Sequence, residues 1–219
     1  MQAVRAVFFD FDGTIANTER GIKNAIRFSL AEKGIPVGDP AGLNYFIGPP
    51  LYDGYSHVYG TEEPLTSELV DLYRVYYQKQ GVFELDLYPG IRELLEALKA
   101  AGIKTAVTSS KPLHFLQMAV PFVGIDDLLD AVIGPELHNK NADKTYLVGC
   151  ALAQLNLSAG PDICMVGDRH YDVTGGKNAG VSAIGVTYGF GSEQELLTAG
   201  ADAIAHSPQE LKSLLLPNG

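Results

Sequence analysis

Two aspartates stand two positions apart near the start of the chain, in the segment Asp10-Phe11-Asp12-Gly13-Thr14. In an extended backbone, side chains two positions apart point to the same side, so both carboxylates can face one ligand. An aspartate carboxylate can attack phosphorus, and a second carboxylate can transfer protons. A polar turn with a helix-capping aspartate is the alternative, but this pair directly follows an apolar run. We therefore take Asp10 as a candidate nucleophile and Asp12 as a candidate general acid/base.

The elements that must position this pair alternate along most of the chain. Short apolar runs predict strands at residues 4–9, 105–107, 131–133, 163–166, 183–186 and 203–205. Between them, the sequence predicts helices at residues 91–101, 113–120, 144–155, 173–179, 194–199 and 208–216. Strands that alternate with helices favour a parallel sheet with helices on both faces. The predicted fold class is therefore α/β, a doubly wound, Rossmann-like parallel sheet.

Three of the predicted strands end in residues that can do chemistry. The first is followed by Asp10 and Asp12, the second by Thr108 and Ser109, and another by Asp168. In open parallel sheets, ligands bind at the carboxyl ends of the strands. The sequence therefore predicts one site that gathers these side chains.

Residues 16–85 have a different pattern. A helical pattern ends before Gly34, residues 35–64 are rich in glycine and proline, and residues 65–78 again have helical spacing. No convincing strand is present in this stretch. We therefore expect a core of residues 1–15 and 86–219, with residues 16–85 inserted as a small all-helical domain.

The segment Asp10-Phe11-Asp12-Gly13-Thr14 resembles the first motif of phosphatases in the haloacid dehalogenase-like superfamily. The resemblance covers nearly the whole chain, because the other motifs follow in the same order. It implies that Asp10 attacks phosphorus and binds Mg²⁺. It also implies that Asp12 protonates the leaving group, later activates water, and binds the metal through its backbone carbonyl.

The second and third motifs of the family concern the phosphate. The segment Thr108-Ser109-Ser110-Lys111-Pro112 resembles the second, which implies that Thr108 supplies a hydroxyl and Ser109 its backbone N–H. The third motif is a lysine that neutralises charge between nucleophile and phosphate. Lys144 fits the family's spacing better than Lys140, although both remain possible and a surface lysine is the alternative for either.

The segment from Gly167 to Asp172 resembles the fourth motif, Gly-Asp-x-x-x-Asp. It implies that Asp168 is a direct Mg²⁺ ligand, in the hard-oxygen surroundings that this ion prefers. Asp172 then either supports the direct ligands from behind or binds the metal through water. His170, in the same segment, is expected to be a surface side chain, since a site with Asp12 needs no further base.

In relatives with an insertion after the first motif, a helical cap closes over the catalytic centre, so the resemblance implies that residues 16–85 are a cap. The loop around Gly48 is our candidate for a contact with substrate, with an ordinary cap loop as the alternative. Lys23 is a weaker candidate. This chain has Asn17-Thr18 where relatives commonly have Asp-Ser, and both residues can still cap a helix.

The closest resemblance, which includes Gly167-Asp168-Arg169 and the segment Gly185–Gly191, is to phosphoglycolate phosphatases and 5′-nucleotidases. It implies a Mg²⁺-dependent phosphatase that acts on a small phosphorylated metabolite. The alternatives are a sugar-phosphate mutase, a dehalogenase, a phosphonate hydrolase or a non-catalytic binding module. A metal-independent dehalogenase would leave Asp12 and Asp168 unexplained.

Composition limits the remaining choices. The 219 residues carry a formal net charge of −10, which disfavours binding to a nucleic-acid polymer. No apolar run reaches the roughly 20 residues that span a bilayer, and the first apolar stretch meets Asp10 too early for a signal peptide. Cys150 and Cys164 read as free buried thiols. We therefore expect a cytoplasmic protein without membrane association, and the sequence predicts no oligomeric state.

Overall fold

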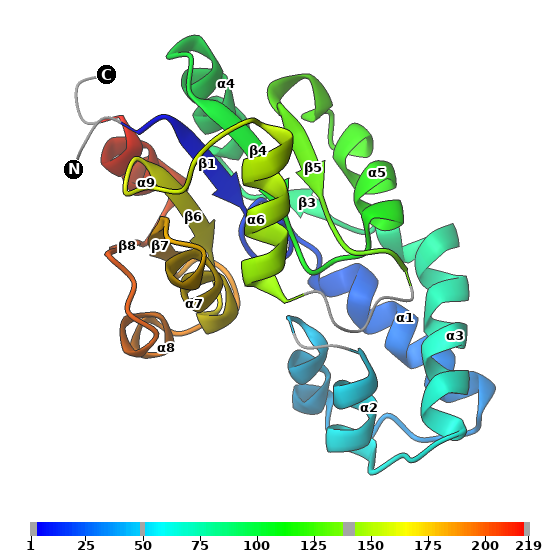
Figure 1. Ribbon diagram of the computed structural model, residues 1–219. Coiled ribbons are helices and arrows are strands. Elements are labelled where there is room, and N and C mark those ends of the chain that lie inside the picture. Colours follow the sequence, from blue (N-terminus) through cyan, green and yellow to red (C-terminus); the bar gives the residue numbers. More distant parts are fainter. Residues whose placement is uncertain (1–3, 49–50, 138–142, 217–219) are drawn as a thin grey trace. The chain divides into compact units, whose positions relative to one another are not determined.

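The computed structural model describes residues 4–48, 51–137 and 143–216 (Figure 1). The chain divides into two compact units. The core unit comprises Met1–Asn17 and Leu87–Gly219, and the helical unit comprises Thr18–Asp86. The division thus falls one or two residues later than the sequence predicted at each crossing. None of the helices in the described part of the chain is long and apolar enough to cross a membrane.

In the described part of the core unit, a six-stranded parallel sheet has the order β5-β4-β1-β6-β7-β8 (Figure 1). Its strands are β1 (Ala6–Phe9), β4 (Lys104–Thr108), β5 (Ala131–Ile133), β6 (Ile163–Gly167), β7 (Ser182–Val186) and β8 (Ala203–Ala205). All four residues of β1 are fully buried. A central parallel strand is covered on both faces, which explains why β1 is a continuous apolar run.

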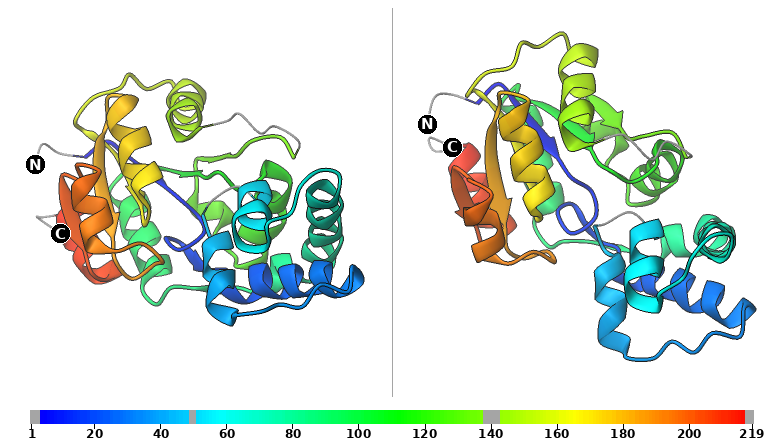
Figure 2. Two further views of the ribbon diagram at one scale, coloured as in Figure 1. Left: turned by 90° about the horizontal axis from the view of Figure 1, so that it is seen from below. Right: turned by 60° about the horizontal axis from the view of Figure 1, so that its bottom comes forward.

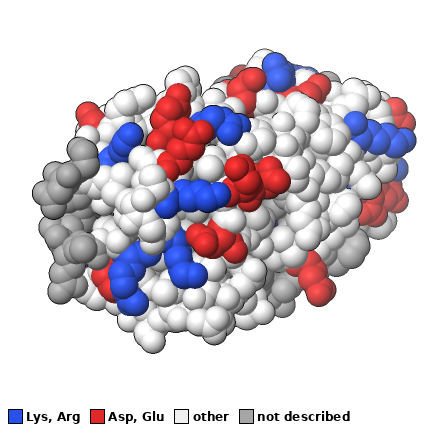
Figure 3. All heavy atoms as spheres, turned by 90° about the horizontal axis from the view of Figure 1, so that it is seen from above, with Lys and Arg blue, Asp and Glu red and all other residues white. Residues whose placement is uncertain are grey.

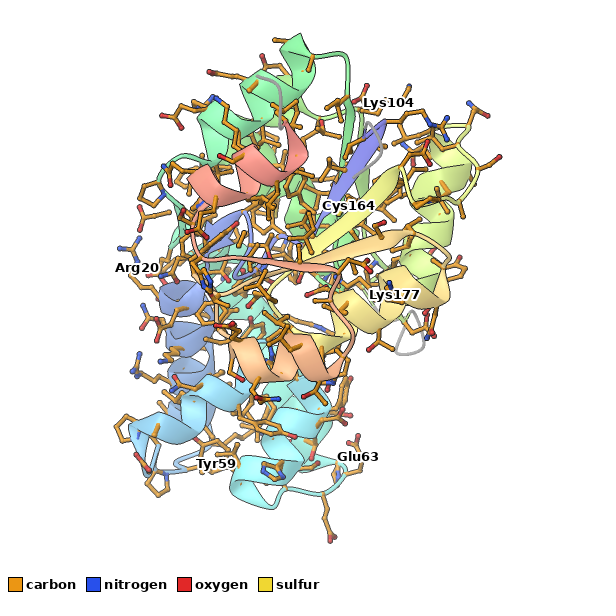
Figure 4. The ribbon with its side chains drawn as sticks, turned by 90° about the vertical axis from the view of Figure 1, so that its left-hand side faces the viewer. Arg20, Tyr59, Glu63, Lys104, Cys164 and Lys177 are labelled. Carbon is orange, nitrogen blue, oxygen red and sulfur yellow. The ribbon has the colours of Figure 1, made fainter. Side chains whose placement is uncertain are left out.

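Helices cover both faces of the sheet, as the right-hand view of Figure 2 and Figure 4 show. On one face, α6 (Lys144–Gln154) contacts β4 and β5, and α7 (His170–Asn178) contacts β6 and β7. On the other face, α4 (Ile91–Ala100) contacts β4, and α9 (Pro208–Leu215) contacts β8. Helix α5 (Leu113–Phe122) contacts β5, and α8 (Glu193–Thr198) contacts β7 and β8. The predicted α/β class with a doubly wound parallel sheet is confirmed.

The hydrophobic core follows the alternation of side chains along β1. Ala6 and Phe8 belong to one buried cluster with Leu147 and Ala151 of α6. Val7 and Phe9 must then point to the opposite face, because successive residues of a strand alternate. Both faces of β1 are therefore sealed by apolar packing, and the polar side chains that could do chemistry follow its carboxyl end.

The cysteines are free, as the sequence predicted. Cys164 is buried in β6 within the sheet (Figure 4), and burial raises the pKa of its thiol to about 12. Cys150 is only partly buried, packed against the hydrophobic core, so the expectation of a buried thiol is met only in part at this residue.

The helical unit contains α1 (Glu19–Glu32), η1 (Pro40–Phe46), α2 (Leu51–Tyr59), α3 (Leu65–Lys79) and η2 (Gly81–Phe83). Helix α1 packs against α3. Tyr55 of α2 is fully buried, and its hydroxyl lies 2.5 Å from Ser29 Oγ of α1. At the end of α2, Tyr59 (labelled in Figure 4) donates a hydrogen bond of 2.9 Å to the Val37 carbonyl. The helical unit therefore has its own packed interior.

Two local features differ from the sequence-based expectation. Helix α2 was not predicted, because Gly54 in its middle and two preceding prolines argue against a helix. The structure explains Gly54: a Cβ at this position would lie 2.6 Å from the Phe46 ring. The expected absence of strands from residues 16–85 is also wrong, because β2 (Ala16–Asn17) pairs with β3 (Asp86–Leu87).

Candidate active site

The carboxyl ends of three neighbouring strands bring the predicted residues together. Phe9 of β1 pairs with Val107 of β4 on one side and with Val166 of β6 on the other. Asp10 directly follows β1, Thr108 is the last residue of β4, and Asp168 directly follows β6. The register of the sheet therefore places all three at one edge.

The turn after β1 depends on Gly13. Its φ of +81° is in the left-handed region that favours glycine. A Cβ there would also lie 2.3 Å from Asp168 Oδ2. Backbone hydrogen bonds of 2.9 Å from Gly13 N–H to the Ala16 carbonyl and of 3.0 Å from Ala16 N–H to the Phe11 carbonyl close the turn. The loop that carries both aspartates is thus fixed directly against the loop after β6.

Lys144, the first residue of α6, lies at the centre of the site. Its Nζ lies 3.1 Å from Asp10 Oδ1 and 2.7 Å from Asp172 Oδ1. It also donates a hydrogen bond of 3.1 Å to the Thr108 carbonyl. Burial acts to lower the pKa of Lys144, but the two carboxylates outweigh it and hold that pKa above its ordinary value. Lys144 is therefore a positive charge in contact with the candidate nucleophile, while Lys140 lies outside the described residues.

The backbone of α7 makes room for this lysine. A Cβ at Gly175 of α7 would lie 2.5 Å from Lys144 Cβ. Helices α6 and α7 contact each other side by side. A larger residue at Gly175 would push α6 outward and take Lys144 away from Asp10.

Carboxylate oxygens of Asp10, Asp168 and Asp172 all lie within 4.8 Å of one another. Asp168 is fully buried, and its two oxygens accept hydrogen bonds from Thr14 Oγ1 at 3.2 Å and Phe190 N–H at 2.9 Å. These bonds fix the carboxylate but do not neutralise it. Among the described residues, three carboxylates against the one Lys144 ammonium leave an excess of two negative charges when all are ionised.

Burial and this excess of negative charge raise the pKa values of two carboxyl groups in the cluster. Burial, and then the neighbouring Asp172 and Asp10 carboxylates, raise the pKa of Asp168 to about 8. Burial also raises the pKa of Asp172 to about 6, although Lys144 opposes the shift. Buried like charges are costly unless something compensates them. A divalent cation held by hard oxygen donors would do so, and the cluster could therefore hold a metal ion.

The carboxylate of Asp12 does not belong to this cluster. Lys111 Nζ donates to both of its oxygens, at 2.9 Å and 3.2 Å. Lys111 received no role from the sequence, although it stands in the same hydroxyl-rich segment as Thr108. The sequence feature that could have indicated a role for Lys111 is its place within the second motif of an otherwise acidic chain. Asp12 remains a predicted metal ligand through its backbone carbonyl.

The two candidate phosphate-binding residues behave differently. Thr108 Oγ1 is buried and has no hydrogen-bond partner within the described residues, so this hydroxyl is available to a ligand. The Ser109 N–H donates to the Ile133 carbonyl at 3.0 Å. The sheet therefore already uses this N–H, and its contact with phosphate stays a prediction. The Ser109 hydroxyl accepts a hydrogen bond from Lys111 N–H at 3.2 Å.

The remaining candidates lie elsewhere. Gly48 is exposed in the helical unit, with a φ of +109°, and Lys23 pairs with Glu19 within α1. The role of either residue in substrate binding stays a prediction. His170 is 41% exposed at its side chain, and its Nδ1 lies 2.8 Å from Glu195 Oε1. It therefore faces α8 rather than the carboxylate cluster.

The loop between β7 and α8 packs against the acidic loops. A Cβ at Gly189 would lie 2.2 Å from the Gly13 carbonyl oxygen, and one at Gly191 would lie 1.8 Å from the Asp168 carbonyl oxygen. Only glycine can occupy either position without moving the loop that carries Asp168. Gly189 and Gly191 therefore let this segment pack directly against the loops that carry the catalytic motifs.

A family model described as haloacid dehalogenase-like hydrolase matches residues 7–186, which include the loops after β1, β4 and β6. The chain belongs to this family. The match extends from β1 to the end of β7, and thus includes the inserted helical unit. The family predicted from the sequence is confirmed.

Individual relatives agree. The chain is 38% identical over 190 residues to a 5′-nucleotidase of Pseudomonas aeruginosa, covering 87% of this chain and 86% of that protein. It is 29% identical over 226 residues to a phosphoglycolate phosphatase of Yersinia pestis, covering 99% and 96%. The crystal structure of a predicted phosphatase from Clostridium acetobutylicum has a TM-score of 0.91 and 36% identity, covering 99% of this chain and 100% of that one. The predicted enzyme class, a phosphatase of the haloacid dehalogenase-like family, is confirmed.

Proposed function

We propose that this protein hydrolyses a small phosphomonoester in the presence of Mg²⁺, through a phosphorylated Asp10. One observation carries the proposal. Asp10, at the carboxyl end of the central strand, contacts the buried Lys144 at 3.1 Å and shares a cluster with Asp168 and Asp172. This arrangement joins a nucleophile, a fixed positive charge and a site for a divalent cation, which are the parts that phosphoryl transfer needs.

Mg²⁺ fits the residues present. Asp10 and Asp168, together with the Asp12 carbonyl, would hold the ion, since hard oxygen donors suit it. Asp172 would orient the site from beside Lys144. When bound, Mg²⁺ supplies positive charge to the phosphoryl oxygens and offsets the excess negative charge of the cluster.

The reaction then has two steps carried by side chains. In the first, a carboxylate oxygen of Asp10 forms a bond to phosphorus, the bond from phosphorus to the leaving oxygen breaks, and Asp12 donates a proton to that oxygen. In the second, Asp12 takes a proton from water, the water oxygen bonds to phosphorus, and the bond to Asp10 breaks. Inorganic phosphate leaves, and both carboxyl groups return to their starting states.

Two polar groups hold the phosphoryl group during these steps. The Lys144 ammonium neutralises charge between Asp10 and the phosphoryl oxygens. The unpaired Thr108 hydroxyl donates a hydrogen bond to one of them. Donors that are fixed before the reaction stabilise the transition state most strongly, because they need no reorganisation.

The helical unit is proposed to act as a cap that selects the leaving group, with Gly48 as the candidate contact. This role rests on the insertion of the unit directly after the first motif and on the family. Replacing the segment around Gly48 should change the preference among substrates while leaving hydrolysis of a small aryl phosphate nearly unchanged. An unchanged preference would show that this segment does not select the leaving group.

Phosphoglycolate and nucleoside 5′-monophosphates are the first candidate substrates, because relatives carry those names. The test is phosphate release by the purified protein from a panel of phosphorylated metabolites, each with Mg²⁺ and with EDTA. Mg²⁺-dependent release from one or a few compounds supports the proposal and identifies the substrate. Transfer of phosphate to a sugar instead of water would support a mutase, and silence from folded protein would favour a non-catalytic module.

A further inference from the structure

Each carboxylate of the Asp10–Asp12 pair has its own buried lysine. Lys144 contacts Asp10, and Lys111 contacts Asp12, from a position 99 residues further along the chain. The two lysines follow different elements, since Lys144 begins α6 and Lys111 follows β4. The motifs account for Lys144, whereas no function has been given to Lys111.

Lys111 is buried to the same degree as Lys144. The side chains are 5% and 4% exposed. Burying an ammonium is costly unless it is paired, and the bond to both Asp12 oxygens provides the pairing. Lys111 Nζ also lies 5.9 Å from the centre of the fully buried Phe11 ring. The aromatic ring and the carboxylate together define one position for this ammonium.

The backbone that carries Lys111 is fixed from the neighbouring strand. Ser109 N–H donates to the Ile133 carbonyl at 3.0 Å, and Leu113 N–H donates to the Pro135 carbonyl at 2.8 Å. Gly134 lies between these acceptors, and a Cβ there would lie 2.5 Å from the Lys111 carbonyl oxygen. The turn is therefore anchored on both sides of the lysine.

The Asp12 carboxylate is partly exposed, with 18% of its side chain accessible. A proton carrier on a flexible rotamer loses efficiency once it leaves hydrogen-bond reach of the reacting oxygen. A donor to both oxygens holds the rotamer without covering the whole group.

We propose that Lys111 is a positioning residue that orients the Asp12 carboxyl group for both proton transfers. This inference rests on the proposed function, because it assigns Lys111 to the acid/base half of that mechanism. The two lysines then have different roles, since Lys144 serves the nucleophile and the phosphoryl group, whereas Lys111 serves the proton carrier.

The test compares two leaving groups in Lys111→Met. An alkyl phosphate needs a proton on its leaving oxygen, whereas p-nitrophenyl phosphate has a leaving group that departs without one. We expect kcat/KM for the alkyl phosphate to fall about 100-fold, and that for p-nitrophenyl phosphate to fall by less than about fivefold. An equal loss on both substrates would overturn the inference, because it would place Lys111 at the phosphoryl group.

The second half-reaction gives an independent readout. With p-nitrophenyl phosphate, Lys111→Met should release one equivalent of nitrophenol per enzyme in a rapid burst, followed by slow turnover. Water activation by Asp12 would then limit the rate. Absence of a burst, with steady-state turnover as slow as the first turnover, would contradict the inference.

Two variants separate positioning from a general loss of structure. Lys111→Arg keeps the positive charge and should recover about tenfold of the loss on the alkyl phosphate. In an Asp12→Asn background, Lys111→Met should cause no further loss, because residues that act as one unit are not additive. A further 100-fold loss in that background would show that Lys111 acts elsewhere.

Lys177→Met is the matched control. Lys177, labelled on α7 in Figure 4, pairs with Asp202 at 2.6 Å, but both side chains are exposed. Its loss should leave both substrates unaffected. If the wild-type protein shows no Mg²⁺-dependent hydrolysis, the proposed function fails. If the wild type is active and only the leaving-group pattern is absent, the inference on Lys111 fails alone.

Discussion

Aspartates lie at both ends of the parallel sheet, and the two ends surround them differently. At the end where strands begin, Asp162 precedes β6 and Asp202 precedes β8. Asp162 pairs with Arg5, whose hydrogen bond is the main cause of a lowered pKa for that carboxyl. Partial burial acts to raise the pKa of Asp202, but Lys177 and a backbone N–H outweigh it and lower that pKa. Each of these aspartates is thus stabilised as an anion by its own partner.

At the end where strands finish, the balance is reversed. Asp168 and Asp172 are buried beside Asp10, and Lys144 is the lysine that pairs with this cluster among the described residues, through Asp10 and Asp172. Burial and mutual repulsion raise the pKa values of Asp168 and Asp172. This end is therefore less stable than it would be with neutral side chains.

The aspartates where strands begin each have a partner that stabilises their charge, whereas those where strands finish repel one another. On the face seen in Figure 3, at the end where β1 begins, acidic and basic side chains are interspersed, and no large area of the described residues has one sign. At the other end, carboxylates in excess of their lysine partner are buried in the core. A protein keeps such a destabilising cluster where a ligand or a reaction needs it.

The largest expected effect comes from replacing one aspartate by asparagine at each end of the sheet and comparing the two activities. Asp10→Asn should lower kcat by about four to six orders of magnitude, because the nucleophile is lost. The variant should remain folded, since Asn has nearly the same shape and one repelling charge disappears. Asp162→Asn, at the opposite end, should retain full activity. Phosphate release and thermal unfolding of both variants provide the measurement, and near-normal turnover in Asp10→Asn would refute the assignment.

The lysines at the two ends should differ in their contribution to the free energy of unfolding. Lys144→Met removes the ammonium that pairs with Asp10 and the buried Asp172, and should lower the free energy of unfolding by about 3–5 kcal/mol. Lys177→Met removes an exposed pair and should change it by less than about 1 kcal/mol. Urea denaturation of the metal-free proteins measures both. Equal effects would mean that the carboxylate cluster does not depend on the Lys144 ammonium for its stability.

Mg²⁺ should stabilise the folded protein by binding at the end of the sheet that has the excess of carboxylates. Mg²⁺ at about 100 times its dissociation constant should raise the free energy of unfolding by about 2.7 kcal/mol, because it binds the folded state. Asp168→Asn should abolish this gain, whereas Asp202→Asn should keep it. Thermal shifts with and without Mg²⁺ decide the matter, and a gain that survives in Asp168→Asn would place the ion elsewhere.

Glu195 of α8 offers the smallest effect. It accepts hydrogen bonds from His170 N–H and Arg169 Nε, each at 2.9 Å. Burial acts to raise the pKa of Glu195, but these donors prevail and lower it to about 2. A lowered pKa gives stability that is complete above about 4.5 and is lost as the pH falls towards 2, here about 1–2 kcal/mol after allowance for solvent.

Glu195→Gln should flatten this acid limb of the stability curve. The measurement is the free energy of unfolding between pH 2 and pH 6 for both proteins. A parallel pair of curves would show that Glu195 behaves like a solvent-exposed acid, unlike the paired aspartates at the beginning of the strands.

Much of this architecture could be predicted from the sequence. Strands β5 and β8 have the predicted bounds, because a buried parallel strand is a short apolar run with clear ends. Asp10, Thr108 and Asp168 could be brought together because parallel strands share one carboxyl edge. Local pattern and simple topology were sufficient for these features.

Features that depend on contacts distant in sequence could not be predicted. The bond from Lys111 to Asp12 joins residues far apart, and no periodicity reveals it. The N–H of Ser109 is used by β5, which only the register of the sheet determines. Helix α7 begins at His170, three residues before the predicted start, and Asp172 accepts a hydrogen bond of 3.1 Å from Arg169 N–H at that start. A capping interaction within a catalytic motif is easily mistaken for loop.

The most direct test of the central claim is to detect phosphate on Asp10. Asp12→Asn should still be phosphorylated by an aryl phosphate but should lose the base that activates water, so the intermediate should accumulate. After mixing with Mg²⁺ and substrate, the protein is quenched in acid, digested and analysed by mass spectrometry. We predict a phosphoryl group on the peptide that contains Asp10, absent when Asp10→Asn is added. Release of nitrophenol from the Asp12→Asn protein without any phosphorylated peptide would contradict this mechanism.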